Sequence, residues 1–172
     1  MSETVQENEL PFVHLRDITI ADGDLLAELS TPEVEGLWNT FDDPPEAMLS
    51  GAHYGGGSLM VESLDETPIG IVTWIQIPYG PNRRSLAWNI GITILPEFRG
   101  RGFGAAAQRC LADKLFTGSD ANRIVADTDI ANVAEQRSLE CAGFVREGVA
   151  RGAQWRQGTW HDRVIYSRLR TD

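Results

Sequence analysis

The chain has few cysteines. Cys110 and Cys141 are the two among its 172 residues, and they lie far apart in the sequence. Neither belongs to a paired metal-ligand or redox motif, so we predict no metal site, and a reducing compartment fits best. Because both fall within helical apolar patterns, we expect buried thiols rather than nucleophiles.

Long apolar runs and targeting signals are also missing. Residues 1–9 are polar and acidic, without the basic start or the apolar stretch of a signal peptide. No stretch is long enough to cross a membrane as a helix, so we expect no membrane partner and a cytoplasmic protein. We also expect a mobile start over residues 1–10 and a single domain over residues 11–172, because a chain of this length buries one real core.

Basic residues are also scarce relative to acidic ones. The chain has 15 lysines and arginines against 25 aspartates and glutamates, which gives a formal net charge of -10. Such a surface repels a phosphate backbone, so general nucleic-acid binding is not expected. The acidic excess would suit a cationic acceptor such as an amine, but an ordinary solvated surface is the simpler interpretation.

The apolar pattern alternates between strand and helix spacing. In the first half it predicts strands over residues 12–16, 59–63, 69–77 and 85–95, and a helix over residues 22–29. The second and third of these strands read as a hairpin around the turn Asp65-Glu66-Thr67-Pro68. Residues 31–57 carry prolines and three consecutive glycines, so we expect loops mixed with short helices, a kind of segment that often covers a site.

The second half continues this alternation. Apolar residues from Phe103 onward recur at helical spacing and predict a helix of roughly three to four turns. A strand over residues 123–127 follows, then a helix opened by Asn132, with Glu135 completing a reciprocal cap and Gly143 as the stop. The next strand begins near Phe144, and residues 152–168 read as two strands around a turn at Gly158. The class is therefore mixed α/β or α+β.

The most informative stretch is a glycine-rich turn between the strand over residues 85–95 and the helix that follows it. Its residues are Arg99, Gly100, Arg101, Gly102, Phe103 and Gly104. Glycine lets the backbone approach a phosphate, and the N–H groups at the start of a helix attract negative charge. A nucleotide P-loop and the dinucleotide fingerprint both fail, because no Gly-Lys-Ser/Thr follows and the glycines are evenly spaced. By itself the turn indicates either a pyrophosphate site or tight packing of a helix on a sheet.

Several spaced motifs resemble one family. The pattern Arg99-x-x-Gly102-x-Gly104 after a strand resembles the acetyl-CoA motif R/Q-x-x-G-x-G/A of the GNAT superfamily of N-acetyltransferases. Further matches resemble its RimJ/RimL-like branch: Asn132, Ala142-Gly143-Phe144, Glu147-Gly148, Arg151, Gly158-x-Trp160-His161-Asp162 and Tyr166-Ser167. The resemblance covers residues 12–169 in element order and is weak over residues 31–57.

This resemblance implies the GNAT fold. It consists of a mostly antiparallel central sheet of about seven strands, flanked by helices, which splays open at an acetyl-CoA cleft between the strand ending at Leu95 and the strand over residues 123–127. Acetyl-CoA is the cofactor that the family uses. Its contacts would come from backbone groups of Ile92 and Ile94 to the pantetheine amides, from backbone N–H groups of residues 99–104 to the pyrophosphate, and from Asn132 to the pantetheine arm.

The residues that would move protons depart from the family pattern. Many relatives carry Glu where this chain has Asn89, which cannot be a general base but can hydrogen-bond the amine or a water. Relatives also often place Tyr where this chain has Leu139. Glu135 and Ser138 are therefore candidates for the acid that protonates the thiolate, with water as the alternative. A capping role is the favoured one for Glu135, and a structurally neutral role for Ser138.

The resemblance implies acetyl transfer to a primary amine, either a protein or peptide N-terminus or a small cationic amine, by direct attack in a ternary complex. Candidates for the acceptor pocket are Trp38, Tyr54, Trp74 and Trp88, although most aromatic residues lie in cores. A GNAT-fold enzyme with another acyl or aminoacyl donor and a non-catalytic CoA-binding protein are the alternatives. The oligomeric state stays open, a homodimer included.

Overall fold

The structure is built on one seven-stranded sheet with the strand order β1-β2-β3-β4-β5-β7-β6. The computed structural model describes residues 10–36, 38 and 55–172, so residues 1–9, which we expected to be mobile, lie outside it. The strands are Val13–Arg16 (β1), Gly56–Ser63 (β2), Pro68–Pro78 (β3), Leu86–Ile94 (β4), Arg123–Asp129 (β5), Val145–Arg156 (β6) and Thr159–Leu169 (β7).

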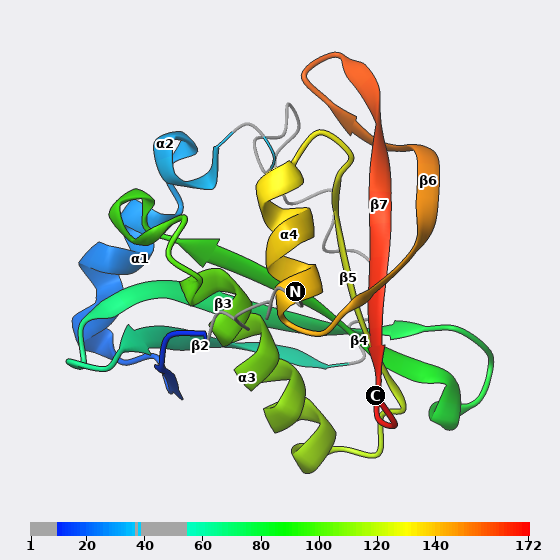
Figure 1. The fold of residues 1–172 in the computed structure, drawn as a ribbon, viewed down its shortest axis with the longest axis horizontal. Coiled ribbons are helices and arrows are strands. Elements are labelled where there is room, and N and C mark those ends of the chain that lie inside the picture. Colours follow the sequence, from blue (N-terminus) through cyan, green and yellow to red (C-terminus); the bar gives the residue numbers. More distant parts are fainter. Residues whose placement is uncertain (1–9, 37, 39–54) are drawn as a thin grey trace, which may run out of the picture.

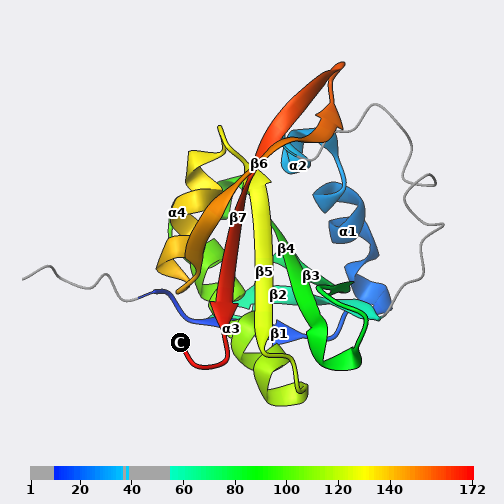
Figure 2. The same ribbon diagram turned by 90° about the vertical axis from the view of Figure 1, so that its right-hand side faces the viewer.

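Helices cover both faces of this sheet. Helices α1 (Gly23–Leu29) and α2 (Pro32–Glu35) lie on one side, and α3 (Phe103–Gly118) and α4 (Val133–Cys141) lie on the other, as Figure 2 shows. The main apolar core fills the space between the sheet and α3, whereas a smaller cluster of Leu29, Val34 and Leu95 seats α1 and α2. Among the described residues, no helix has the length and apolar character needed to span a membrane. The predicted α+β class is confirmed.

The strands at the C-terminal end of the chain differ from the prediction in one respect. The strand expected near Phe144 and the one expected from residue 152 are a single strand, β6, which pairs with β7 as a long hairpin that projects beyond the sheet in Figure 1. The strand continues through a register irregularity between Ala150 and Gln154, where Gly152 has φ +54°. An extra residue in one strand bends the ladder without ending it.

The feature that creates a site is the junction between β4 and β5. All other neighbouring strands pair antiparallel, but these two are parallel and share only two residue pairs, Trp88 with Ile124 and Asn89 with Val125. Beyond that point β4 runs on to Ile94 and β5 to Asp129 without being paired to each other. The two strands therefore diverge, and the splay that the family resemblance implied is confirmed.

A buried ion pair ties the projecting hairpin to the end of β5. The side chains of Arg156 and Asp129 are each 2% exposed, and the guanidinium Nη2 lies 2.5 Å from the carboxylate Oδ2. Burial by itself would raise the pKa of Asp129, but the backbone N–H of Ala131 and the guanidinium of Arg156 hold it below its usual range. Arg156 also donates to the carbonyl of Trp38 at 2.8 Å. The buried ion pair thus connects the backbone at Trp38, the end of β5 and the β6–β7 hairpin.

We expect Asp129→Asn to lower the free energy of unfolding by about 3–5 kcal/mol, because it leaves the buried guanidinium without its counter-charge. Urea denaturation monitored by circular dichroism measures the change. Asp113→Asn is the matched control: it breaks the ion pair of the 57% exposed Asp113 with Arg168 and should cost at most about 1 kcal/mol. Equal losses in the two variants would contradict the role assigned to the Asp129 pair.

Candidate active site

A cleft of ≈ 1800 Å³ opens where β4 and β5 diverge. Its walls come from β4, the glycine turn, the first turns of α3, the end of β5 and one face of α4. The lining brings together these predicted site residues: Asn89, Ile92, Ile94, Arg99, Gly100, Arg101, Gly102, Gly104, Asn132, Glu135 and Ser138. Residues more than 40 positions apart in the sequence therefore share one concave surface, which is the usual form of a ligand site.

The orientation of the β4 backbone follows from its pairing with β3. Leu95 N donates to Ile69 O at 2.9 Å, and residues of an antiparallel strand alternate in the direction of their backbone groups. The backbone groups of Ile92 and Ile94 therefore point away from β3, toward the splay. Ile94 O accepts a hydrogen bond from Arg99 Nε at 2.8 Å, whereas the N–H of Ile94 and both backbone groups of Ile92 face the cleft.

The glycine turn exposes the start of α3. Gly100 and Gly102 have φ of +70° and +84°, and Gly102 is the N-cap of the helix without a side-chain cap. The first intrahelical bond runs from Ala106 N to Gly102 O at 3.0 Å, so the N–H groups of residues 103–105 precede it and have no carbonyl partner within the helix. Donors of this kind, at the positive end of a 16-residue helix, favour a bound anion.

The side chains of this turn make contacts within the protein. The guanidinium of Arg99 bonds the backbone carbonyls of Ile94 and Val34, which ties α2 to the end of β4. Arg101 lies over the rings of Phe98 and Phe103, at 5.6 and 5.1 Å from their centroids. The Phe103 ring is buried in the core. Backbone groups, rather than these side chains, are therefore the main anion donors that the turn offers.

The start of α4 corrects our expectation of a reciprocal cap. Asn132 Oδ1 accepts from Glu135 N at 3.3 Å, as predicted, and its Nδ2 donates to Thr128 Oγ1 at 3.1 Å. Glu135 does not return the bond, because the N–H of Asn132 already donates to Asp129 O at 2.9 Å. Instead the Glu135 carboxylate accepts from Gln108 Nε2 on α3. The favoured capping role of Glu135 was therefore wrong.

Glu135 is a cleft carboxyl whose pKa is shifted by its surroundings. Burial raises its pKa from 4.5 to about 7, and the hydrogen bond from Gln108 opposes only part of this rise. Ser138, expected to be an exposed helix residue, is partly buried and donates to Gln108 Oε1 at 2.9 Å. Leu139, at the position where relatives often place Tyr, is buried in the core and does not line the cleft.

The wall nearest Asn89 carries the acceptor candidates. Trp38, Trp74 and Asn89 line the cleft together with Asp127 and Arg163, whose guanidinium bonds the carboxylate and the carbonyl of Asp127. Trp88 does not line it, because its indole Nε1 donates to Ser119 Oγ at the far end of α3. Tyr54 lies outside the described residues.

The cysteines also differ from the expectation of buried thiols. Cys141 is exposed and lines the cleft at the end of α4. Cys110 is half-buried, and burial raises the pKa of its thiol. No group of side chains suited to hold a metal ion occurs among the described residues.

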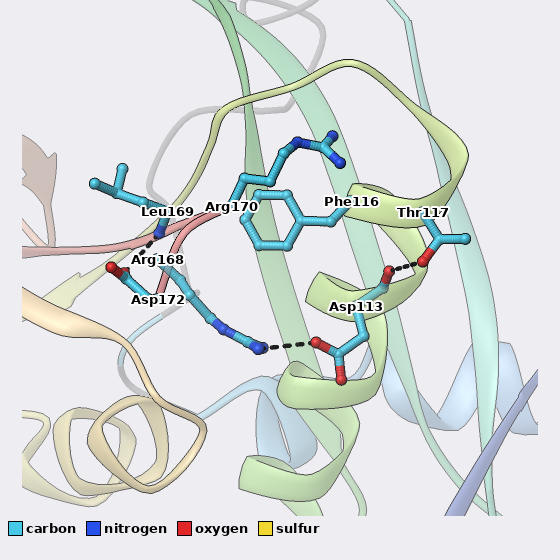
Figure 3. A pocket seen from close by; sticks show the side chains of 7 residues that line it. All are labelled: Asp113, Phe116, Thr117, Arg168, Leu169, Arg170 and Asp172. Carbon is cyan, nitrogen blue, oxygen red and sulfur yellow. Dashed lines mark hydrogen bonds and ion pairs between the residues drawn. The ribbon is translucent and has the colours of Figure 1, made fainter.

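A second, smaller hollow of ≈ 380 Å³ lies beside the C-terminal half of α3, as Figure 3 shows. Several of its polar groups are engaged by the protein: Arg168 pairs with Asp113 at 2.9 Å, and Leu169 N donates to Asp172 at 2.8 Å. The ring of Phe116 fills the space between Arg168 and Arg170. The splayed cleft, and not this hollow, contains the predicted site residues.

Comparison with known proteins identifies the family. A family model described as an acetyltransferase (GNAT) domain matches residues 13–145. YjcK of Bacillus subtilis, named as a probable N-acetyltransferase, is 32% identical over 139 residues, which cover 81% of this chain and 74% of YjcK. YdaF of the same organism, which carries the name of a ribosomal N-acetyltransferase, is 35% identical over 83 residues, 48% of this chain and 45% of YdaF.

Solved structures agree with this family at the level of the fold. Mycobacterium smegmatis RimJ, in complex with CoA-disulfide, matches with a TM-score of 0.75 at 19% identity, over 92% of this chain and 82% of RimJ. Vibrio cholerae spermidine N-acetyltransferase, in complex with CoA and spermine, matches with a TM-score of 0.71 at 23% identity, over 92% of this chain and 96% of that one.

The chain belongs to the acetyltransferase (GNAT) family, because the family model matches more than half of it and YjcK is similar over most of both chains. It is an acyltransferase. The resemblance to the GNAT superfamily is thus confirmed, and the similarity to YdaF over 48% of this chain agrees with its RimJ/RimL-like branch.

Three residues of the cleft region were missed by sequence reasoning: Gln108, Asp127 and Arg163. For Gln108 a signal was present, since it falls at helical spacing in the stripe of Leu111 and Leu115 that faces the core. A polar residue in such a stripe needs hydrogen-bond partners. Asp127 and Arg163 carried no comparable signal, because their pairing depends on the register of β5 with β7.

The raised pKa of Glu135 predicts a pH-dependent gain of stability in Glu135→Gln. Below about pH 4.5 the carboxyl is protonated in both the folded and the unfolded chain, so it contributes no difference. Between pH 4.5 and about 7 the unfolded carboxyl ionises first, so wild type loses stability relative to the variant. Above pH 7 the free energy of unfolding of the variant should exceed that of wild type by about 3 kcal/mol, as measured by urea titrations at several pH values. A difference that stays constant over this range would contradict the shift.

Proposed function

We propose that this protein transfers an acetyl group from acetyl-CoA to a primary amine, either a protein or peptide N-terminus or a small cationic amine. The observation that carries the proposal is the cleft at the β4–β5 splay, in which unpaired strand backbone and the exposed start of α3 meet. The CoA bound to RimJ and the CoA and spermine bound to the Vibrio cholerae enzyme support the same chemistry here.

The residues of the cleft fit coenzyme A in shape and charge. In this proposal the N–H groups of residues 103–105 hold the pyrophosphate, and the backbone groups of Ile92 and Ile94 bind the pantetheine amides in the way that a neighbouring strand would. Asn132 is the N-cap of α4 and lines the cleft, where its side chain can contact the pantetheine arm. Bound acetyl-CoA would supply the acetyl group as an activated thioester.

The chain's own groups then position the acceptor and handle two protons. Attack by the neutral amine joins its nitrogen to the acetyl carbon, the carbon–sulfur bond breaks, the nitrogen loses a proton and the sulfur gains one. Asn89 can accept a hydrogen bond from the amine, while the proton of the nitrogen leaves through water, because Asn cannot be a base. We assign delivery of the proton to sulfur to Glu135.

The proposal is tested by a panel of amines with acetyl-CoA, monitored by release of free thiol. The panel contains peptides with free N-termini, the same peptides acetylated at the N-terminus, and polyamines such as spermine. We expect turnover with at least one free amine and none with a blocked peptide. Tight CoA binding without turnover of any amine would contradict acetyl transfer and favour a CoA-binding protein.

The pyrophosphate position predicts that Gly102→Glu weakens CoA binding at least about 100-fold in calorimetry, because the side chain brings negative charge to the anion site. A Cβ at this glycine would also lie 2.9 Å from Pro11 Cδ, at a φ that disfavours side chains. Gly118→Glu is the matched control, since it makes the same change at the other end of α3, where a Cβ meets nothing within 4 Å.

Gly102→Ala separates charge from strain in this experiment, because it keeps the backbone penalty without the carboxylate. Thermal unfolding shows whether each variant is folded. If folded Gly102→Glu and Gly118→Glu bound CoA equally well, the pyrophosphate would lie elsewhere.

A further inference from the structure

We propose that Gln108 is a positioning residue, which fixes one oxygen of Glu135 and thereby directs the carboxyl group at the leaving sulfur. This inference rests on the proposed acetyl transfer and adds a residue of α3 to its machinery. It also gives Ser138 a role different from that of an acid, namely to orient Gln108.

Gln108 bridges the two helices that form one wall of the cleft. Its side chain is 2% exposed, and both ends of its amide are bonded to α4. Nε2 donates to Glu135 Oε1, and Oε1 accepts from Ser138 Oγ at 2.9 Å. An amide buried in an apolar stripe costs free energy unless it is hydrogen-bonded, so these two contacts determine where the side chain can lie.

The partners also fix which way the amide faces. The hydroxyl of Ser138 donates to the amide oxygen, which leaves the NH₂ group directed at Glu135. An NH₂ group is only a donor, and it engages Glu135 Oε1. The other carboxyl oxygen, Oε2, is then the one that carries the transferable proton on the cleft side. Loss of Ser138 would release the amide to rotate and would loosen Glu135 indirectly.

The spacing of the two helices depends on Gly104, the last glycine of the acetyl-CoA motif. A Cβ at this position would lie 3.0 Å from Ser138 Oγ. Glycine therefore permits the close approach of α3 and α4 that brings Ser138 within reach of Gln108. The motif glycine thus serves the hydrogen-bonded bridge in addition to the backbone of the anion site.

Gln108 acts on Glu135 through a hydrogen bond rather than through net charge. Burial raises the pKa of Glu135, and the bond from Gln108 is the one influence that lowers it. No charge contributes to this shift, although the elements around Glu135 carry many titratable groups. They are Arg101 beside α3, Arg109, Cys110, Asp113 and Lys114 on α3, Arg123, Asp127 and Asp129 on β5, Arg146, Glu147, Arg151 and Arg156 on β6, and Arg137, Glu140 and Cys141 on α4. Removal of Gln108 should therefore raise the pKa of Glu135 further.

The test is the pH dependence of turnover in Gln108→Met, which keeps the length and volume of the side chain but not its hydrogen bonds. An acid must be protonated to act, so turnover falls as the pH rises through its pKa. We expect this alkaline limb to move up by about 1 pH unit in Gln108→Met, with a lower maximal kcat and an unchanged KM for acetyl-CoA. In Glu135→Gln the limb should disappear and kcat should fall.

Two further variants separate positioning from general damage. Ser138→Ala keeps Gln108 but frees its amide, and it should lower kcat in the same direction by a smaller factor. Gln136→Met removes another glutamine, whose Nε2 donates to Ile130 O on the exposed side of α4, and it should leave both kcat and the limb unchanged. A purely structural role for Gln108 would lower activity at all pH values without moving the limb, and that result would overturn the inference.

A readout without turnover keeps this inference separate from the proposed function. Carbon-13 NMR of protein labelled at the glutamate carboxyls follows the titration of Glu135. Its signal is the one that is missing from the spectrum of Glu135→Gln. We expect a midpoint near 7 in wild type and a higher one in Gln108→Met. If the midpoint shifts but no amine is acetylated, the bond to Gln108 stands and the acetyl transfer fails. An identical midpoint in both proteins would refute the role of Gln108.

Discussion

The interruption of the ladder between β4 and β5 is the constraint on which the rest of the site depends. Every other pair of neighbouring strands satisfies its backbone groups over most of its length, whereas this pair meets at only two positions. Backbone N–H and C=O groups in a sheet need partners, and a strand edge inside a molecule presents a ready-made row of them. A ligand with amide groups completes such an edge. The unpaired backbone of this edge therefore suits the extended, amide-containing cofactor of the proposed function.

Several arginine side chains at the site make contacts within the protein. The chain is strongly acidic overall, yet Arg99, Arg101, Arg109, Arg137 and Arg163 all line the cleft. Arg99 and Arg163 are engaged with backbone carbonyls or Asp127, and Arg109 donates to Cys141 O. The five arginines bring positive charge to the cleft, and three of them are held in place by hydrogen bonds within the protein. Net charge consequently says little about this site, because the local distribution differs from the average.

Much of the fold could be predicted from local patterns, and the reason is visible in particular elements. Phe103, Leu111 and Leu115 recur with the helical period, and on α3 they face the apolar core. The turn at residues 65–68 joins β2 to β3 as expected. Prediction failed where tertiary contacts decide. The cap expected from Glu135 was lost because its carboxylate accepts a hydrogen bond from Gln108 on α3, and Trp88 donates to Ser119 instead of lining the cleft. Such competition between partners from distant segments leaves no trace in sequence spacing.

The position of Leu139 shows why the proposed catalytic residues were the hardest to predict. A motif-based comparison points to that position as the place of the acid, but in this chain its side chain is fully buried in the core. Helix α4 presents Glu135 and Ser138 to the cleft instead, one turn away from each other on the same face. A carboxyl group needs desolvation to hold a proton near neutral pH, and the wall shared with α3 supplies it. Replacement of a phenol by a leucine at one position is therefore compatible with a proton donor at another, provided that the neighbouring helix supplies a partner such as Gln108 to hold it.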